Sequence, residues 1–202
     1  MNISNNNEID KMINPLVMLI PHKYLEAVLA LNRILKNKNV EWALSGDLGE
    51  ALETVHVEPD CIEIVTSLKG VQQIYKAVQE YKPKEIELRI EVLPKNALIE
   101  EKEHPVKIRS YFFEFSINNI KIKVYGDLQY QISDWEWGDK IEFKPDYISV
   151  IGQNIAVVPL ELKYELYLGL GWKDRAEKVW IVLSRKFRGF NLKQTKMKNH
   201  VH

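Results

Sequence analysis

The stretch from Trp42 to Thr66 holds three acidic side chains that could do chemistry, Asp47, Asp60 and Glu63. Asp47 follows a Ser-Gly pair, and Asp60 and Glu63 flank the start of a predicted apolar strand. Magnesium prefers hard oxygen ligands such as carboxylates. Side chains alternate along a strand, so Glu63 shares a face with Cys61, whose soft sulfur suits magnesium poorly. Asp60 reaches the same face as Glu63 only if a bulge at the start of the strand reverses the alternation.

The Ser-Gly-Asp turn is the candidate phosphate-binding element. Ser45, Gly46 and Asp47 open a predicted short helix, and backbone N–H groups at a helix start bind anions without side-chain help. A structural interpretation stays open, in which Gly46 serves a tight strand-to-helix connection and Asp47 caps the helix. Glu63 is harder to explain structurally, because burying a carboxylate is costly unless it is paired or ligated. Lys123 is its candidate ion-pair partner.

Basic and aromatic residues later in the chain add candidate ligand contacts. Lys163 and Lys173 are candidate phosphate ligands, with a solvated helix face as the alternative. Trp135 and Trp137 suit either stacking on a nucleic-acid base or packing at an edge or a homodimer surface. The tail 185–202 is basic, which suits contact with RNA phosphates or a protein partner, or only solubility.

The elements that must position these residues follow from hydrophobic periodicity and turn residues. Asn118-Asn119 predicts a tight hairpin turn, since asparagine tolerates positive φ. The resulting fold class is α+β (α/β), a mixed, largely antiparallel sheet with helices packed on it, plus C-terminal helices. The expected helices cover 24–35, the short segment after 46, 67–81, 160–168 and 173 to about 184. The expected strands cover 42–44, 61–65, 85–93, 111–117, 120–124, 147–151 and 155–158, with an edge strand near 140–143 and a surface loop over 94–109.

Length and composition predict one continuous domain. The chain has 202 residues, 28 basic and 28 acidic side chains and one cysteine, so neither a basic field for nucleic acid nor a disulfide is expected. We expect an N-terminal arm over 1–22, a core over 23–158, a C-terminal helical segment of the same domain over 159–184 and a basic tail over 185–202. The longest apolar run near the start is too short to span a membrane, and without a signal peptide we expect a cytoplasmic protein.

The order of elements resembles the nucleotidyltransferase superfamily, the polymerase-beta-like fold. Ser45-Gly46-Asp47 occupies the family's glycine turn, and Cys61-Ile62-Glu63 occupies its Asp-x-Asp strand, with Asp60 one residue early. The run from Pro159 to Lys178 is similar to the family's closing helices. The likeness covers roughly residues 23–184.

The resemblance implies transfer of a nucleoside monophosphate from a nucleoside triphosphate to an acceptor, with Mg²⁺ held by Asp60 and Glu63 as candidate metal ligands and catalytic residues. It implies a third carboxylate on a neighbouring strand, for which Asp127 is the candidate catalytic residue. Lys123 and Cys61 depart from the family's pattern. Three hypotheses therefore stay open: a metal-dependent nucleotidyltransferase, a degenerate module of the same fold that binds a nucleotide, RNA or protein, and a structural protein.

Overall fold

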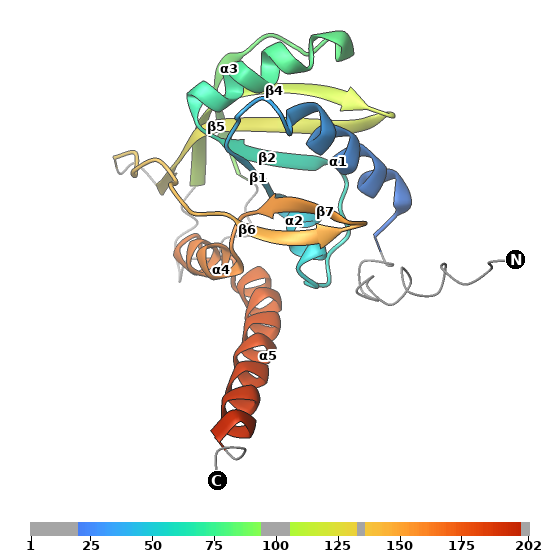
Figure 1. Cartoon of the computed structure of the whole chain (residues 1–202). Coiled ribbons are helices and arrows are strands. Elements are labelled where there is room, and N and C mark those ends of the chain that lie inside the picture. The colour runs from blue at the N-terminus through green and yellow to red at the C-terminus, as the bar shows by residue number, and fades with distance from the viewer. Residues whose placement is uncertain (1–19, 94–105, 133–135, 199–202) are drawn as a thin grey trace, which may run out of the picture.

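Seven strands form one mixed sheet through the middle of the molecule (Figure 1). The computed structural model describes residues 20–93, 106–132 and 136–198, with side chains in the last helix described as far as residue 186. Within these ranges the elements in chain order are α1 (His22–Leu35), β1 (Trp42–Ser45), α2 (Gly46–Leu52), β2 (Ile62–Thr66), α3 (Leu68–Ala77), the 3₁₀ helix η2 (Gln79–Tyr81), β3 (Glu87–Val92), β4 (Val106–Ile117), β5 (Ile120–Ile132), β6 (Asp146–Val150), β7 (Gln153–Val157), α4 (Leu160–Gly169) and α5 (Lys173–Lys198).

The strand order confirms the predicted fold class. The sheet runs β3-β4-β5-β2-β1-β7-β6. The pairs β2 with β5 and β1 with β7 are parallel, whereas the other four neighbouring pairs are antiparallel. The class is therefore α+β with a mixed, largely antiparallel sheet.

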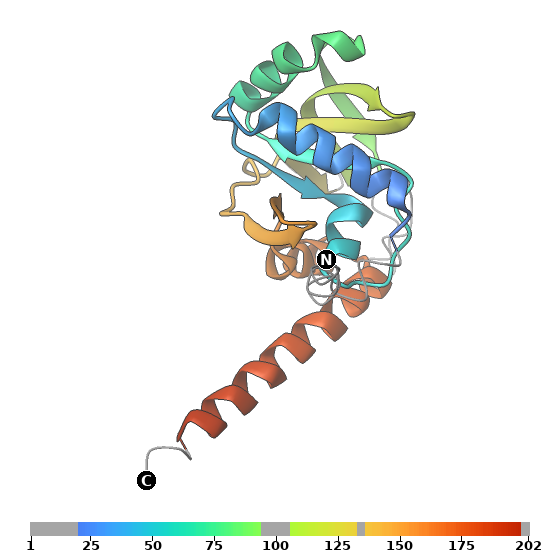
Figure 2. The same cartoon turned by 45° about the vertical axis from the view of Figure 1, so that its right-hand side comes forward.

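The two faces of the sheet differ in what covers them. Helices α1 and α3 lie across one face, as Figure 2 shows, and with α2 they bury the larger apolar core, in which Leu31, Ile64 and Phe113 are fully buried. The other face carries a smaller cluster around Val65, Phe112 and Tyr125. The side chains that could do chemistry lie on this second face.

Turn chemistry explains the two hairpins. Asn118 and Asn119 have φ values of 51° and 62°, which confirms the predicted tight turn between β4 and β5. Ile151 (φ 47°) and Gly152 (φ 71°) turn the chain between β6 and β7. This turn begins one residue before the gap between the expected strands 147–151 and 155–158. Ser67 caps α3, because its hydroxyl accepts from the backbone N–H of Gly70 at 3.1 Å.

Three boundaries differ from the sequence prediction. Strand β4 already begins at residue 106, inside the predicted loop, and β5 continues to residue 132. Residues 140–143 run alongside β5 without forming the predicted edge strand; Ile141 N donates to Leu128 O at 2.9 Å. Helix α5 continues to Lys198 instead of ending near 184, and it projects away from the sheet (Figure 1). The division into core and C-terminal segment stays a prediction.

Within the described residues, no helix has both the length and the apolar character needed to cross a membrane.

Candidate functional site

A row of three polar side chains crosses adjacent strands on the second face of the sheet. Ser45 on β1 lies opposite Glu63 on β2, and Glu63 lies beside Lys123 on β5. All three line one cleft of about 460 Å³ between the sheet and helices α4 and α5. Gly46, Asp47 and Asp60 line the same cleft, so the fold brings most of the predicted site together.

Glu63 is the central carboxylate of this row. Its side chain is 30% exposed, and its Oε1 lies 3.6 Å from Lys123 Nζ. Burial raises the pKa of Glu63 above its usual value, and the charge of Lys123 only partly opposes this. Gly46, at a φ of 56°, lies directly against Glu63, because a Cβ at Gly46 would overlap the Glu63 carboxylate. The glycine therefore makes room for Glu63 as well as for the turn.

Asp60 and Cys61 form the entrance side of the cleft. Strand β2 begins after them, so Asp60 reaches the cleft from the preceding bend, and it is exposed. Cys61 is buried, with its Sγ 4.0 Å from Glu63 Oε1. Burial, reinforced by Asp60 and Glu63, raises the pKa of the Cys61 thiol to about 12. The thiol is therefore protonated at neutral pH and is a poor metal ligand.

A buried polar network on the helical side was not found from the sequence. Glu50 of α2 is fully buried, and its Oε1 accepts hydrogen bonds from Tyr167 and, at 3.1 Å, from Arg175. Lys163 Nζ lies 3.9 Å from the same oxygen. Arg175 also pairs with Asp47. The available signal was the spacing of Asp47 and Glu50, which places both carboxylates on one side of a short helix.

Three buried donors around the cleft are left without acceptors. Among the described residues, Lys163 Nζ, Trp172 Nε1 and Arg175 Nε have no hydrogen-bond partner, and all three side chains line the cleft. Of the acceptors in this network, Glu50 Oε2 is also unpaired. Unsatisfied buried donors are uncommon in folded proteins, so this wall of the cleft suits a ligand rich in acceptor oxygens.

Asp127 does not join the other carboxylates. Strand register places Asp127 and Leu128 of β5 opposite the single residue Ser110 of β4, and Asp127 has a φ of 50°. This bulge reverses the side-chain alternation, so Leu128 and Tyr130 line the cleft.

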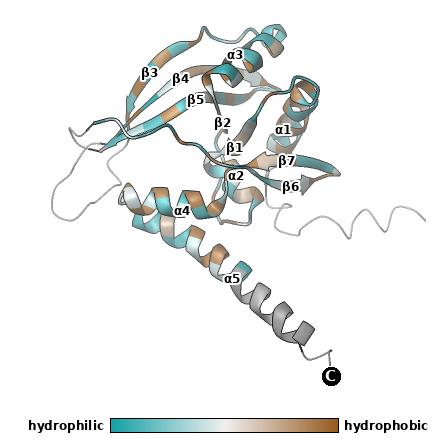
Figure 3. Cartoon of the chain, turned by 60° about the vertical axis from the view of Figure 1, so that its left-hand side comes forward, coloured by the Kyte–Doolittle hydropathy of each residue, from teal (hydrophilic) through white to brown (hydrophobic). Residues whose placement is uncertain are grey.

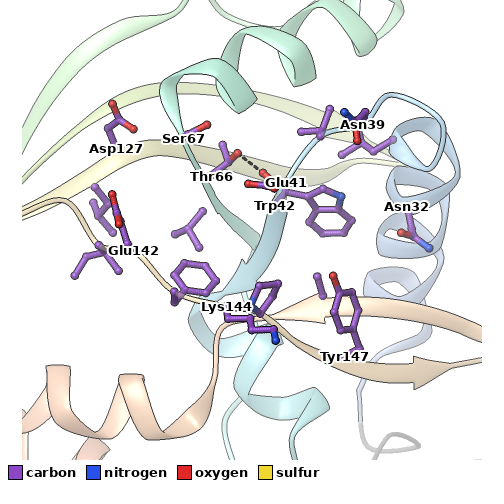
Figure 4. Close-up of a pocket in the computed structure, with 18 of the residues that line it drawn as sticks. Asn32, Asn39, Glu41, Trp42, Thr66, Ser67, Asp127, Glu142, Lys144 and Tyr147 are labelled. Atoms are coloured by element: carbon purple, nitrogen blue, oxygen red, sulfur yellow. Dashed lines mark hydrogen bonds between the residues drawn. The ribbon is translucent and has the colours of Figure 1, made fainter.

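Asp127 instead stabilises the neighbouring elements at a second cleft, shown in Figure 4. Its Oδ1 accepts from Leu68 N at 3.1 Å, and its Oδ2 accepts from Lys140 Nζ at 2.7 Å. The expectation that Asp127 converges with Asp60 and Glu63 is therefore corrected by the bulge.

The remaining predicted ligands differ in where they lie. Lys163 lines it, whereas Lys173 is exposed at the start of α5 and does not. Trp137 lies under the guanidinium of Arg109, at 4.6 Å from the ring centre, and Trp135 is outside the described residues. In the basic tail, Lys186 pairs with the buried Glu53 at 2.7 Å.

The donor set does not fit a two-magnesium site. The described residues contain no group of three histidine, cysteine, aspartate or glutamate side chains placed to hold a metal ion. Glu63 and Asp47 face Lys123 and Arg175, and these cations occupy the region where a metal would have to lie. Two-metal catalysis requires ligands that bridge ions a few ångströms apart.

Comparison with solved structures identifies the fold. A candidate nucleotidyltransferase from Thermotoga maritima matches with a TM-score of 0.60 and 27% identity, over 83% of this chain and 96% of that chain. The antibiotic-resistance factor ANT(2″)-Ia matches at 11% identity and a TM-score of 0.45, over 89% of this chain and 98% of that chain. Its complex with adenylyl-2″-tobramycin matches at 10% identity and a TM-score of 0.41, over 83% and 97%. These two scores are too low to support an argument.

No protein-family model and no curated protein matches the chain. The fold is shown by the strand order together with the Thermotoga maritima structure, which covers most of both chains. The chain therefore has the fold of the nucleotidyltransferase superfamily.

Proposed function

We propose that this protein binds a nucleoside triphosphate in the cleft between the sheet and helices α4 and α5, without a two-magnesium site. The observation that carries the proposal is the contact of 3.6 Å between Lys123 Nζ and Glu63 Oε1. Lys123 stands where a metal would otherwise balance the charge of Glu63. A lysine so placed neutralises a phosphate as a point charge, because its ammonium group is mobile and strongly hydrated.

The unpaired donors support an oxygen-rich ligand. Lys163, Trp172 and Arg175 each have a buried N–H group that is free to donate, and they come from the helical wall of the cleft. Tyr125 and Tyr130 line the opposite wall and provide aromatic surface for a base. In this arrangement the phosphates lie near Lys123 and the base lies among the aromatic side chains.

The carboxylates of the cleft make nucleotide binding dependent on pH. A polyanion beside Glu63 is unfavourable while Glu63 is ionised, and burial already raises the pKa of this group. Phosphate binding near Lys123 therefore favours uptake of a proton by Glu63.

Substitution of Lys123 tests the proposal. Lys123→Gln is expected to weaken ATP binding at least about tenfold, the loss typical of one charge-assisted contact. Lys121→Gln is the matched control, because Lys121 is exposed on the same strand two residues away and does not line the cleft. Isothermal titration calorimetry measures both. Equal ATP affinity in the two variants contradicts the proposal.

Nucleotidyl transfer itself is the second candidate function. It is favoured by the convergence of Asp47, Asp60 and Glu63 on one cleft in a chain with this fold. Transfer requires Lys123 and Arg175 to release these carboxylates. Release of pyrophosphate from ATP by the purified protein, in a screen of acceptor molecules, would favour this candidate.

The basic end of α5 is the candidate surface for RNA or a protein partner. Lys186 and Trp137 already have partners within the chain, so contact with RNA or another protein would draw on the remaining basic residues of α5. Retention of the protein on immobilised RNA at low salt, lost on removal of residues 187–202, tests this role.

A further inference from the structure

Strand β3 forms one edge of the sheet, and within the described residues no strand pairs with its outer side. It is the outermost strand beside β4, and its apolar side chains lie uncovered: Leu88 is 59% exposed, Ile90 57% and Val92 64%. Figure 3 shows β3 at the outer edge of the sheet with hydrophobic and hydrophilic residues in alternation. An exposed apolar edge strand is a template for pairing with another strand.

The backbone of β3 is oriented for such pairing. Leu93 N donates to Val106 O at 2.8 Å, so the odd-numbered residues direct their backbone groups toward β4. Alternation then directs the N–H and C=O groups of Leu88, Ile90 and Val92 away from the sheet. The residues with exposed side chains are also those with outward backbone groups.

The charges of β3 match those of a second copy. Glu87, Arg89 and Glu91 alternate with the apolar residues, and Arg89 contacts Glu87 at 2.7 Å and Glu91 at 2.9 Å within the strand. In an antiparallel pair centred on Ile90, Arg89 of each copy lies opposite Glu91 of the other. Leu88 lies opposite Val92, and Ile90 lies opposite itself.

The neighbouring register is unfavourable. A pair centred on Arg89 places the two Arg89 side chains opposite each other and Glu87 opposite Glu91, which brings like charges together. A pair centred on Leu88 also places Arg89 opposite Glu87, but it overlaps only residues 87–89 of β3, whereas the pair centred on Ile90 overlaps residues 88–92. Charge and overlap together therefore favour the register centred on Ile90 for a copy of the same strand. Self-complementarity of this kind is the property of a two-fold interface.

We propose that two copies of this chain associate through β3, antiparallel about a two-fold axis at Ile90, so that the sheet continues from one copy into the other. The interface reaches the cleft, because Glu91 and Leu93 line it. Arg89 of the second copy then lies beside Glu91 at the cleft edge. The inference rests on β3 alone and holds whether or not the cleft binds a nucleotide.

Disulfide cross-linking of the full chain tests the register. In the proposed pair, Ile90→Cys places two cysteines about 5.5 Å apart between Cα atoms, within the range of a disulfide. Leu88→Cys is the matched control, because its two copies are about 14 Å apart along the strands. Cys61 is buried and common to both variants. Under mild oxidation we expect at least ten times more covalent dimer from Ile90→Cys, and equal or negligible yields overturn the proposal.

The solution mass tests the association itself. We expect the wild-type protein to have the mass of two chains in light scattering at high concentration, and Ile90→Lys to have the mass of one, since two lysines then meet on the axis. Ile181→Lys, a similar change at an exposed residue of α5, should stay dimeric. A wild-type protein with the mass of one chain overturns the proposal, as does a dimer that Ile90→Lys leaves intact.

Discussion

At the scale of single residues, Glu63 determines the electrostatics of the cleft. It is mostly buried, is 3.6 Å from Lys123, and has Cys61 as a second neighbour at 4.0 Å. Burial raises its pKa despite the lysine. A carboxylate in this state accepts a proton more readily than one in water, which links both stability and ligand binding to pH.

The first prediction concerns the pH dependence of stability. Because burial raises the pKa of Glu63 in the folded protein above its ordinary value, the stability that its protonated form contributes is complete below that ordinary value and is lost as pH rises through the folded pKa. Wild type should therefore lose stability relative to Glu63→Gln as pH rises from 4.5 toward neutral. Urea denaturation at several pH values measures this difference.

The control for Glu63→Gln is Glu161→Gln, which removes one carboxylate from the accessible surface of α4. If the unfolding free energies of wild type and Glu63→Gln differ by the same amount at every pH in this range, the prediction is contradicted.

Gly46 supplies the second prediction. Alanine at this position adopts an unfavourable φ of 56°, and the end of the Glu63 side chain must also move aside to make room for its Cβ. Gly46→Ala should lose about 2–4 kcal/mol of unfolding free energy. Gly152→Ala, at a φ of 71° but with nothing within 4 Å, should lose only about 1 kcal/mol. If denaturant titrations show equal losses of unfolding free energy for Gly46→Ala and Gly152→Ala, the contact with Glu63 does not contribute to the loss.

At the scale of elements, the bulge in β5 decides which side chains of this strand face the cleft and which stabilise neighbouring elements. It sends Asp127 to the start of α3 and to Lys140, and it sends Tyr130 to the cleft. Asp127 thereby caps α3 from another strand, in addition to the local cap Ser67. The alternation of side chains along a strand can be predicted from the sequence. The bulge that reverses this alternation in β5 cannot, because it depends on how β5 pairs with β4.

The third prediction follows from this role of Asp127. Asp127→Ala should lose about 1–2 kcal/mol of unfolding free energy, because α3 loses a cap and alanine is strained at positive φ. ATP affinity should stay within about twofold of wild type once the variant is shown to be folded. Asp127→Asn is the control: its amide oxygen can still accept from Leu68 N, and asparagine tolerates positive φ. A large loss of ATP affinity in both variants would instead assign Asp127 to the site.

Most elements could be predicted from the sequence because local signals define them. The Asn118-Asn119 turn, the Ser67 cap and the apolar spacing of α1 each act within a few residues. The extension of β4 and the absence of a strand at 140–143 were missed, because both depend on which neighbour completes the backbone hydrogen bonds.

At the scale of the whole molecule, the cleft joins parts of the chain that are distant in sequence. Arg175 pairs with Asp47 across 128 sequence positions and with Glu50 across 125. Glu63 could be identified as a site residue because a carboxylate on an apolar strand is locally unusual. Arg175 could not, since an arginine on an amphipathic helix is ordinary until the fold places it beside α2.

The central claim is that the cleft binds a nucleoside triphosphate without a two-magnesium site, and calorimetric titration with ATP tests it most directly. The titration is made once with magnesium and once with a chelator, and it is repeated with Lys123→Gln. We predict an affinity that differs by no more than about threefold between the two conditions and falls in the variant. Binding that disappears with the chelator would contradict the claim, as would an absence of ATP binding in both conditions.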